Sequence, residues 1–362
     1  MRRAVSKSKK FLYTFFIFLF FGVIYLIYYD IFEFLKKQIV PLKAEPLSLF
    51  HERRIEAEIF KEHAIKKFLP LRKGLSKHSN EVLDYVINSM IYQGFLKNNK
   101  FEKFELSFPK YIKKYKEQWL IEKEKLKDSI NLDGIRAAPE VFYFHHGLRF
   151  ANSKILNYIK NKDMIDCGCF VGDSLLVLKN YTNKTIYCYD FYKPNIEKFK
   201  KIMKLNKICN GYKLIPMAIG AQIGQIETEQ NNDINVAAVI KKGKETIKIT
   251  TIDEEIKKHN INVGFIKVDV EGDGMNVIKG AINTIKTQRP VLSLAVYHNS
   301  EELFDMKPFL EQYLNDYVFE FKLQAFQLGN FAEMILFVYP KELVDENETT
   351  RENNETYLPM II

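Results

Sequence analysis

The sequence lacks the patterns that mark nucleic-acid-binding modules and small domains held together by metals or disulfides. No zinc-finger, homeodomain or RNP-type signature occurs in its 362 residues. The four cysteines, Cys167, Cys169, Cys188 and Cys209, form no paired CxxC sets. Three of them fall in or beside predicted strands, so we expect buried free thiols and no disulfide framework.

Charge of one sign is not concentrated either. The formal net charge is +9, but the surplus lysines alternate with glutamates in stretches such as KKYKEQWLIEKEKLKD. Interspersed charges of both signs are typical of a solvated helix face, so we predict no nucleic-acid partner. With 47% hydrophobic residues, the chain can form one large domain and an accessory region.

The beginning of the chain differs in kind from the rest. Residues 1–10 are basic, and residues 11–29 form the uncharged run FLYTFFIFLFFGVIYLIYY. About 20 helical residues cross a bilayer core, and no small-residue cleavage site follows the run. The sequence therefore predicts a transmembrane anchor over residues 11–29 and a single-pass membrane localisation. Lysines on both sides of the run leave open which side of the membrane carries the rest of the chain.

Three further segments follow the apolar run. Apolar residues at three- and four-residue intervals predict a juxtamembrane and helical region over residues 30–135. Residues 139–342 alternate predicted strands and helices, and residues 343–362 form a polar tail. The alternation predicts an α/β fold, with a parallel sheet covered by helices on both faces. The last two strands, over residues 317–326 and 332–340, predict an antiparallel hairpin that closes the sheet.

Small residues mark the first strand–helix unit of this domain. In NKDMIDCGCFVGDSLLVLKN, Asp166 ends a predicted strand, Gly168 and Gly172 flank a turn, and Asp173 opens a helix. Ligands of doubly wound sheets bind at the carboxyl ends of the strands, and glycines let backbone approach a ligand closely. Asp173 places a carboxylate where a dinucleotide pyrophosphate would bind, and no GxGxxG turn is present. The turn therefore favours a positively charged cofactor without phosphate over NAD.

Carboxylates also end two other predicted strands. Asp190 ends TIYCYD, where an acid can accept hydrogen bonds from both ribose hydroxyls of an adenosine cofactor. Lys267, Asp269 and Glu271 crowd the end of the strand in VGFIKVDVEG. Two carboxylates on one face of a buried strand are costly unless they face an opening. We expect these groups to line one site; an internal ion pair or a helix cap is the alternative.

Six blocks of the sequence resemble, in order, the FkbM family of S-adenosylmethionine-dependent methyltransferases. The blocks are MIDCGCFVGDSLL, YDFYKPNIEKF, LIPMAIG, TTIDEEI, IKVDVEGDGMNVIKGA and RPVLSLAVYH. The resemblance covers about residues 139–340 and implies a seven-stranded Rossmann-like fold with S-adenosylmethionine as cofactor. It also implies O-methyl transfer, often onto sugar hydroxyls of glycans or natural products.

The resemblance further implies roles for individual residues. Asp190 would bind the cofactor ribose, and Ala218 would border the adenine. The complete cofactor-binding set would be Asp166, Gly168, Gly172, Asp173, Asp190 and Ala218, while Lys267, Asp269, Glu271 and Gly272 would lie near the methyl group and the acceptor. Two positions depart from the family pattern: two extra residues follow Asp190, and Gly274 stands where an acid commonly occurs.

Methyl transfer to a sugar hydroxyl gains from a general base. Asp269, Glu271 and His298 are the candidates, and with Lys267 they form the predicted catalytic set; no metal is predicted. His145 and His146 either cover the site or lie at the surface. The predicted acceptor is a glycan or a lipid-linked sugar, and the oligomeric state is left open. The alternative function is a non-catalytic, membrane-tethered Rossmann-like binding module.

Overall fold

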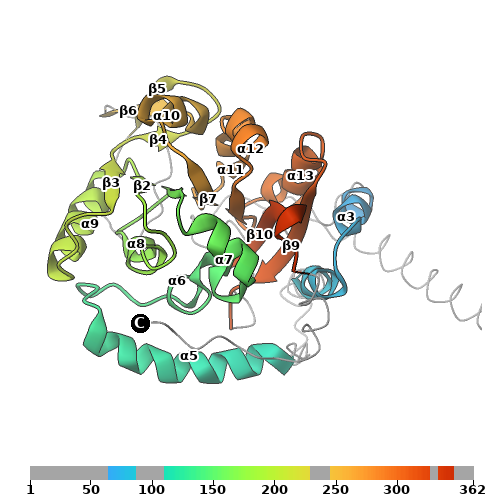
Figure 1. Cartoon of the computed structure of the whole chain (residues 1–362), viewed down its shortest axis with the longest axis horizontal. Coiled ribbons are helices and arrows are strands. Elements are labelled where there is room, and N and C mark those ends of the chain that lie inside the picture. Colours follow the sequence, from blue (N-terminus) through green and yellow to red (C-terminus); the bar gives the residue numbers. More distant parts are fainter. Residues whose placement is uncertain (1–63, 87–109, 229–244, 327–332, 346–362) are drawn as a thin grey trace, which may run out of the picture.

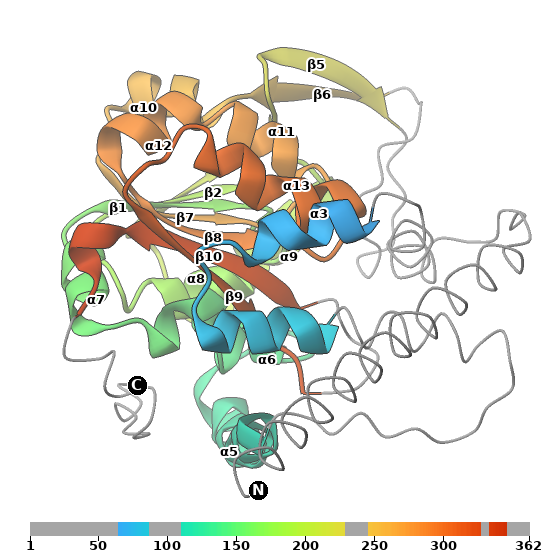
Figure 2. The same ribbon diagram turned by 90° about the vertical axis from the view of Figure 1, so that its right-hand side faces the viewer.

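The computed structural model describes residues 64–86, 110–228, 245–326 and 333–345. These residues form a mixed α/β structure with one seven-stranded and one three-stranded sheet. Helices cover both faces of the larger sheet (Figures 1 and 2). The α/β class and the seven-stranded sheet predicted from the sequence are confirmed.

The larger sheet has the strand order β3-β2-β1-β7-β8-β10-β9. The first five strands in this order, β3, β2, β1, β7 and β8, run parallel to one another. Strand β10 runs antiparallel to both β8 and β9. The predicted antiparallel closing pair is therefore confirmed. Because the strand order reverses between β1 and β7, the loops that follow these strands part and leave room for a ligand. The strands are β1 (Asp163–Cys167), β2 (Ile186–Tyr189), β3 (Tyr212–Ile215), β7 (Val263–Val268), β8 (Val291–Ala295), β9 (Tyr317–Leu323) and β10 (Met334–Pro340).

The central strands are buried on both faces, as parallel strands in α/β proteins usually are. Every residue of β7 and β8 is buried, whereas the edge strand β9 alternates between buried and half-buried residues. Apolar and β-branched residues favour such a pleated, covered position. The sheet is thus a rigid platform, and the carboxyl ends of β1, β2, β7 and β8 meet at one of its edges.

Helices α7, α8 and α9 pack on one face of this sheet, and α10 to α13 pack on the other (Figures 1 and 2). Pro194 lies in the first turn of α9. Residues 274–288 form two helices separated at Gly280, where a Cβ would lie 2.1 Å from the Gly220 carbonyl oxygen. The helices are α7 (Ser153–Ile159), α8 (Asp173–Leu178), α9 (Lys193–Leu205), α10 (Ile252–His259), α11 (Gly274–Lys279), α12 (Ile282–Gln288) and α13 (Ser300–Glu311).

The second sheet, in which β6 pairs with β4 and β5, was not predicted. Pro216 has no backbone N–H and separates β3 from the short strand β4. As a result β3 pairs with β2, and β4 pairs with β6. The three strands are β4 (Ala218–Ile219), β5 (Gly224–Thr228) and β6 (Glu245–Thr250).

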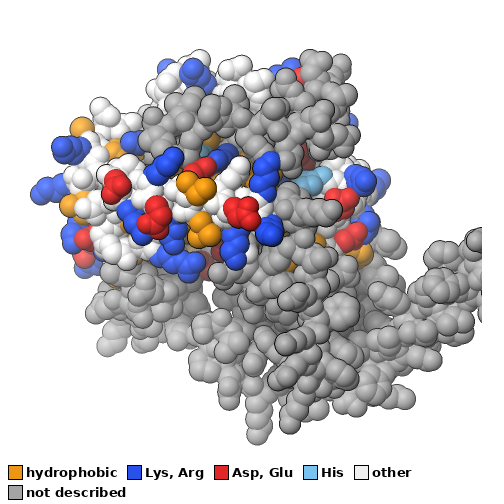
Figure 3. Space-filling model, turned by 90° about the horizontal axis from the view of Figure 1, so that it is seen from below, with side chains coloured by type: hydrophobic (Ala, Val, Ile, Leu, Met, Phe, Trp, Pro, Cys, Tyr) orange, Lys and Arg blue, Asp and Glu red, His pale blue; other side chains and the backbone are white. Residues whose placement is uncertain are grey.

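The described part of the N-terminal region is helical and packs on the main domain. Residues 77–86 are helical, and the other helices here are α3 (Ala64–Arg72), α5 (Lys110–Ser129) and α6 (Pro139–Phe142). Lys67 on α3 forms an ion pair with Asp305 on α13 at 2.8 Å. Arg149 binds both carboxylate oxygens of Glu122 on α5, at 2.6 and 2.8 Å. Figure 3 views the molecule from the α5 side of Figure 1 and shows Lys and Arg side chains interspersed with Asp and Glu.

The predicted single-pass membrane localisation requires a correction. Among the residues that the structure describes, no helix is both long enough and apolar enough to span a bilayer. The 20-residue helix α5 has sufficient length, but lysines and glutamates recur along it. The membrane localisation is therefore not supported. Residues 11–29, the residues 327–332 between the two strands of the predicted hairpin, and the tail after residue 345 lie outside the described residues.

Candidate active site

A buried ion pair joins the two central strands at their carboxyl ends. Asp166 on β1 and Lys267 on β7 are neighbours in the parallel ladder, and Lys267 Nζ lies 3.0 Å from Asp166 Oδ1. The same ammonium donates a hydrogen bond to the Gly168 carbonyl oxygen at 2.8 Å. Burial opposes the lysine charge, but Asp166 and Asp269 outweigh it and raise the pKa of Lys267. Lys267 is therefore a fixed cation beneath the site.

The two glycines of the turn are required for a reason that the sequence did not reveal. Gly168 has a φ of +77°, and a Cβ on it would lie 1.8 Å from the Asp269 carbonyl oxygen. Gly172 has a φ of +83°, and a Cβ there would lie 2.7 Å from the Phe199 ring. Both glycines allow close approach within the protein. They hold the β1–α8 turn against the β7–α11 turn and against α9. Their close approach to a ligand stays a prediction.

Asp173 opens α8, as predicted, and is buried. Its Oδ1 accepts a hydrogen bond from the Ser174 backbone N–H at 3.0 Å. Burial raises the pKa of Asp173 to about 6, although Lys267 opposes the shift. The next residue, Ser174, has its Oγ 2.9 Å from His146 Nε2. His146 is buried, so of the two options left open by the sequence, a surface position is wrong for this residue.

Asp190 directly follows β2 and is held in place by its own loop. Its Oδ1 accepts a hydrogen bond from the Tyr192 backbone N–H at 2.7 Å, and its Oδ2 accepts one from Asn195 Nδ2 at 3.3 Å. The two extra residues after Asp190 thus supply a donor that orients the carboxylate. Burial raises the pKa of Asp190 to about 6, against the effect of the Tyr192 N–H.

The turns after β7 and β8 bring a further set of predicted residues together. His298 Nε2 lies 3.3 Å from Asp269 Oδ1 and 3.5 Å from Glu271 Oε2. Tyr297 donates a hydrogen bond from its hydroxyl to Asp269 Oδ1 at 3.3 Å. Glu271 has a φ of +57°, which is rare for this residue type, and half of its side chain is exposed. Two carboxylates and one imidazole therefore share a partly open corner of the site.

Glu302 on α13 is a component of this corner that the sequence analysis missed. Its carboxylate is buried, with Oε2 3.1 Å from His298 Nδ1 and Oε1 accepting the Gly274 N–H at 2.9 Å. A Cβ at Gly274 would lie 2.7 Å from that same oxygen. Glu302 thus occupies the space that a side chain at position 274 would need. The sequence signal that could have indicated this contact was the position of Glu302, four residues after His298 and in the first turn of α13.

These carboxylates set the charge of His298. Burial lowers its pKa, but the bond to Glu302 and the charges of Asp269 and Glu271 outweigh burial and raise the pKa to about 9. Burial also raises the pKa of Glu271, whereas the charge of His298 acts to lower it. At neutral pH His298 is therefore a cation, and this favours the carboxylates over His298 as the proton acceptor.

Two more acids face the same space and were also missed. Glu140 on α6 has its pKa raised to about 7, chiefly by burial and further by Asp173 and Asp269. Glu333, just before β10, has its pKa raised by burial and by the nearby charge of Glu140. Both residues come from segments remote from the strand-end motifs. Carboxylates therefore outnumber cations around the site.

The structure brings most of the predicted site residues to one sheet edge. Asp166, Gly168, Gly172, Asp173, Asp190, Lys267, Asp269, Glu271 and His298 all lie at or just beyond the carboxyl ends of β1, β2, β7 and β8. Ala218 begins β4, two residues after Pro216, and its contact with adenine stays a prediction. Within the described residues, no cluster of three or more His, Cys, Asp or Glu side chains has a metal-binding arrangement.

Part of the chain matches a known family model. Residues 179–321 match the model of the methyltransferase FkbM domain. The structure of methyltransferase FkbM from Methylobacillus flagellatus is similar, with a TM-score of 0.51, 18% identity, and coverage of 78% of this chain and 60% of that protein. This chain therefore matches less than two thirds of that protein's length.

Two more solved structures show weaker similarity, and a search of curated proteins gave no match. A Streptococcus mutans methyltransferase-type protein in complex with SAH gave a TM-score of 0.35, with 13% identity over 57% of this chain and 99% of that one. The human methyltransferase 10 domain containing protein gave a TM-score of 0.37, with 12% identity over 63% of this chain and 97% of that one. The resemblance expected from the sequence motifs is confirmed by the family model, which matches residues 179–321 of this chain to the methyltransferase FkbM domain.

Proposed function

We propose that this chain transfers a methyl group from S-adenosylmethionine to a hydroxyl oxygen of a sugar. The observation that carries the proposal is the meeting of two groups of acids at one sheet edge. Asp166 and Asp190 end adjacent strands on one side of the switch point, and Asp269, Glu271 and His298 follow the strands on the other. The first group suits a cofactor, and the second suits a hydroxyl acceptor.

The residues present fit a cationic cofactor without phosphate. Asp166 Oδ2 is buried and accepts no hydrogen bond from any described residue, and the surrounding carboxylates favour positive charge. When bound, S-adenosylmethionine would supply an electrophilic methyl group on a positively charged sulfur. Asp190 would accept hydrogen bonds from the ribose, and Asp166 and Asp173 would contribute negative charge beside the cation. Burial raises the pKa of Asp166, and Lys267 would oppose this by favouring the ionised form through their ion pair.

Glu271 is the side chain best placed to take the acceptor proton. It is the more exposed of the two carboxylates beside His298, with 47% of its side chain accessible against 26% for Asp269. A raised pKa brings a carboxylate closer to the operating pH, which suits a general base. His298, held as a cation, would orient both carboxylates, and Tyr297 would fix Asp269.

Transfer to sugars can be tested directly with a labelled methyl group. The full chain is incubated with labelled S-adenosylmethionine and with mixtures of oligosaccharides, and the products are analysed for O-methyl sugars. Appearance of methyl ethers on sugar hydroxyls supports the proposal. Cofactor binding together with methylation only of amines, thiols or carbons would overturn the proposed acceptor class.

Replacing Asp190 with asparagine is expected to weaken S-adenosylmethionine binding about tenfold or more. A hydrogen bond to a charged acceptor is worth about 1.5–3 kcal/mol, and the amide keeps the size but not the charge. Calorimetric titration of the full chain measures the change. Glu197→Gln, which removes a charge from the exposed face of α9, is the matched control. Equal affinity in the Asp190 variant and the control would contradict the ribose-binding role.

Cofactor affinity is also expected to depend on pH. Burial raises the pKa of Asp190 to about 6, so the carboxylate that accepts ribose hydrogen bonds is present above this pH and is lost as the pH falls below it. Affinity should therefore rise as the pH increases through about 6, and the rise should be smaller in the Asp190→Asn variant. An equal pH dependence in both proteins would show that Asp190 does not take part.

A further inference from the structure

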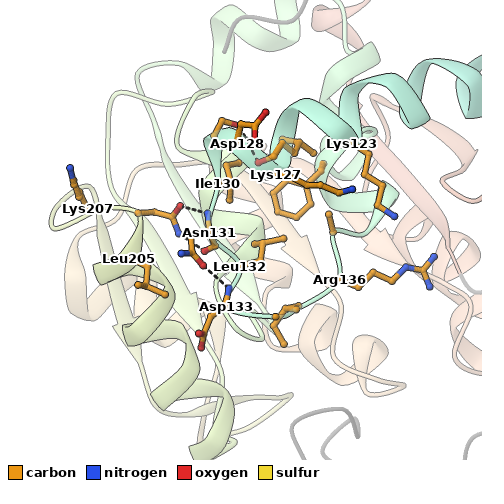
Figure 4. Close-up of a pocket in the computed structure, with 17 residues that line it drawn as sticks. Lys123, Lys127, Asp128, Ile130, Asn131, Leu132, Asp133, Arg136, Leu205 and Lys207 are labelled. Atoms are coloured by element: carbon orange, nitrogen blue, oxygen red, sulfur yellow. Dashed lines mark hydrogen bonds between the residues drawn. The ribbon is translucent and has the colours of Figure 1, made fainter.

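A cavity at the ends of α5 and α9 is not used by the chemistry above. It has a volume of about 820 Å³ and is bounded by the end of α5, the α5–α6 loop over residues 130–137, and the end of α9 (Figure 4). Its volume is within the range of pockets for small organic ligands. Apolar side chains of Leu126, Leu132, Phe142 and Leu205 form part of its lining.

The walls of this cavity are fixed by hydrogen bonds. The Asn131 N–H donates to Asn206 Oδ1 at 2.9 Å, and Asn206 Nδ2 donates to the Asn131 carbonyl oxygen at 2.7 Å. Lys198 and Lys201 of α9 both bind Asp133 Oδ2, at 2.6 and 2.8 Å. The loop is thus attached to α9 at two points. The cavity is preformed, which reduces the ordering cost of binding a ligand.

The charged groups in the lining favour an anion. Lys123, Lys127 and Arg136 lie along one side in Figure 4, and Lys207 lies at the other. Two of the charged lining residues are already paired: Asp133 with the two α9 lysines, and Lys127 with Glu124 at 2.7 Å. This leaves Lys123, Arg136 and Lys207 against the single acid Asp128. A guanidinium and ammonium groups in a lining that also contains apolar side chains match an oxyanion attached to a sugar ring.

The short helix α6 joins this cavity to the active site. Phe142 lines the cavity, and Glu140, two residues earlier on α6, is close enough to Asp173 and Asp269 for their charges to affect it. Arg136 of the cavity acts on the same Glu140 with the opposite sign. We propose that the cavity binds the anionic part of the methyl acceptor, a sugar that carries a phosphate or a carboxylate group. The identification of this ligand as the methyl acceptor rests on the proposed function.

The test uses the single tryptophan of the chain as a reporter. Trp119 is on α5, and the ammonium of Lys123 lies 6.0 Å from its ring centre. Tryptophan emission and calorimetric heat of the full chain are followed during titration with glucose 1-phosphate, glucuronate and glucose. We expect the two anions to bind and glucose to bind at least tenfold more weakly. A preference between the two anions identifies phosphate or carboxylate as the recognised group.

Matched variants locate the binding. The double variant Lys123→Gln with Arg136→Gln is expected to lose about tenfold in anion affinity, and Lys125→Gln, an exposed change on the same helix, is expected to bind like the parent. Equal binding of glucose, no heat with either anion, or unchanged affinity in the double variant would overturn the inference. Cofactor binding is measured separately on the same proteins. Anion binding without cofactor binding would refute the proposed function and leave the anion site in place.

Discussion

Replacing Gly168 with alanine is expected to lower the free energy of unfolding by roughly 3 to 5 kcal/mol and to abolish cofactor binding. The added Cβ would lie 1.8 Å from the Asp269 carbonyl oxygen, and that oxygen is backbone, so it cannot rotate away. The φ of +77° is itself unfavourable for alanine. Removing this clash requires the β1–α8 and β7–α11 turns to separate. Their separation would also break the hydrogen bond from Lys267 Nζ to the Gly168 carbonyl oxygen.

Urea unfolding of the full chain measures this effect. Gly224→Ala is the matched control, since a Cβ there meets nothing within 4 Å and its φ is not positive. Equal midpoints for the two variants would show that the turns can separate at little cost. In that case the calorimetric titration still decides whether the cofactor site needs this close contact.

Replacing Glu302 with glutamine is expected to reduce kcat by roughly 10- to 100-fold with little change in cofactor affinity. Glutamine keeps the length of the side chain but removes the charge that holds His298 as a cation. The pKa of His298, raised to about 9 in the parent, should fall. If the cation is needed, activity is lost as the pH rises through the His298 pKa. The alkaline limb of the kcat/KM profile should therefore move to lower pH.

Three comparisons separate this positioning role from a merely structural one. Glu301→Gln changes an exposed neighbour and should leave the pH profile unchanged. The NMR titration of the His298 imidazole reports its pKa directly. Glu302→Ala opens space beside Gly274, so adding Gly274→Glu to that variant offers a carboxylate from the opposite side and should restore part of kcat. A parental pH profile in Glu302→Gln, with His298 still titrating near its parental pKa, would contradict the role.

The periodicity of the sequence was enough to predict a parallel sheet closed by an antiparallel pair, because the parallel strands β1, β2, β7 and β8 are short apolar runs followed by helices. The number of strands, seven, was implied by the family resemblance. Strand-end polar residues such as Asp166, Asp190 and Asp269 could be predicted as one site, since the carboxyl ends of parallel strands meet at one edge. The second sheet could not be predicted, because it depends on Pro216 separating two strands that otherwise form one apolar segment.

The site residues that were not predicted from the sequence were missed for one reason. Glu140, Glu302 and Glu333 lie on segments with no strand-end motif, and only tertiary packing brings them close to Asp269 and His298. The protonated state of His298 likewise depends on three carboxylates from two places in the chain, the β7–α11 turn and α13. The sequence could show that His298 ends a strand, but not that it would be surrounded by acids and hence a poor base.

The pairing of β1 with β7 has a consequence for how the molecule forms. Lys267 and Gly168 are bonded across 99 positions of sequence, so the site depends on a contact of high sequence separation. The matched family segment, residues 179–321, contains β2 and β7 but not β1, the strand that lies between them, and it also lacks β10. A fragment cut at those limits would expose four unpaired strand edges inside the sheet. The limits of the family match are therefore not the limits of the folding unit, which must extend at least from β1 to β10.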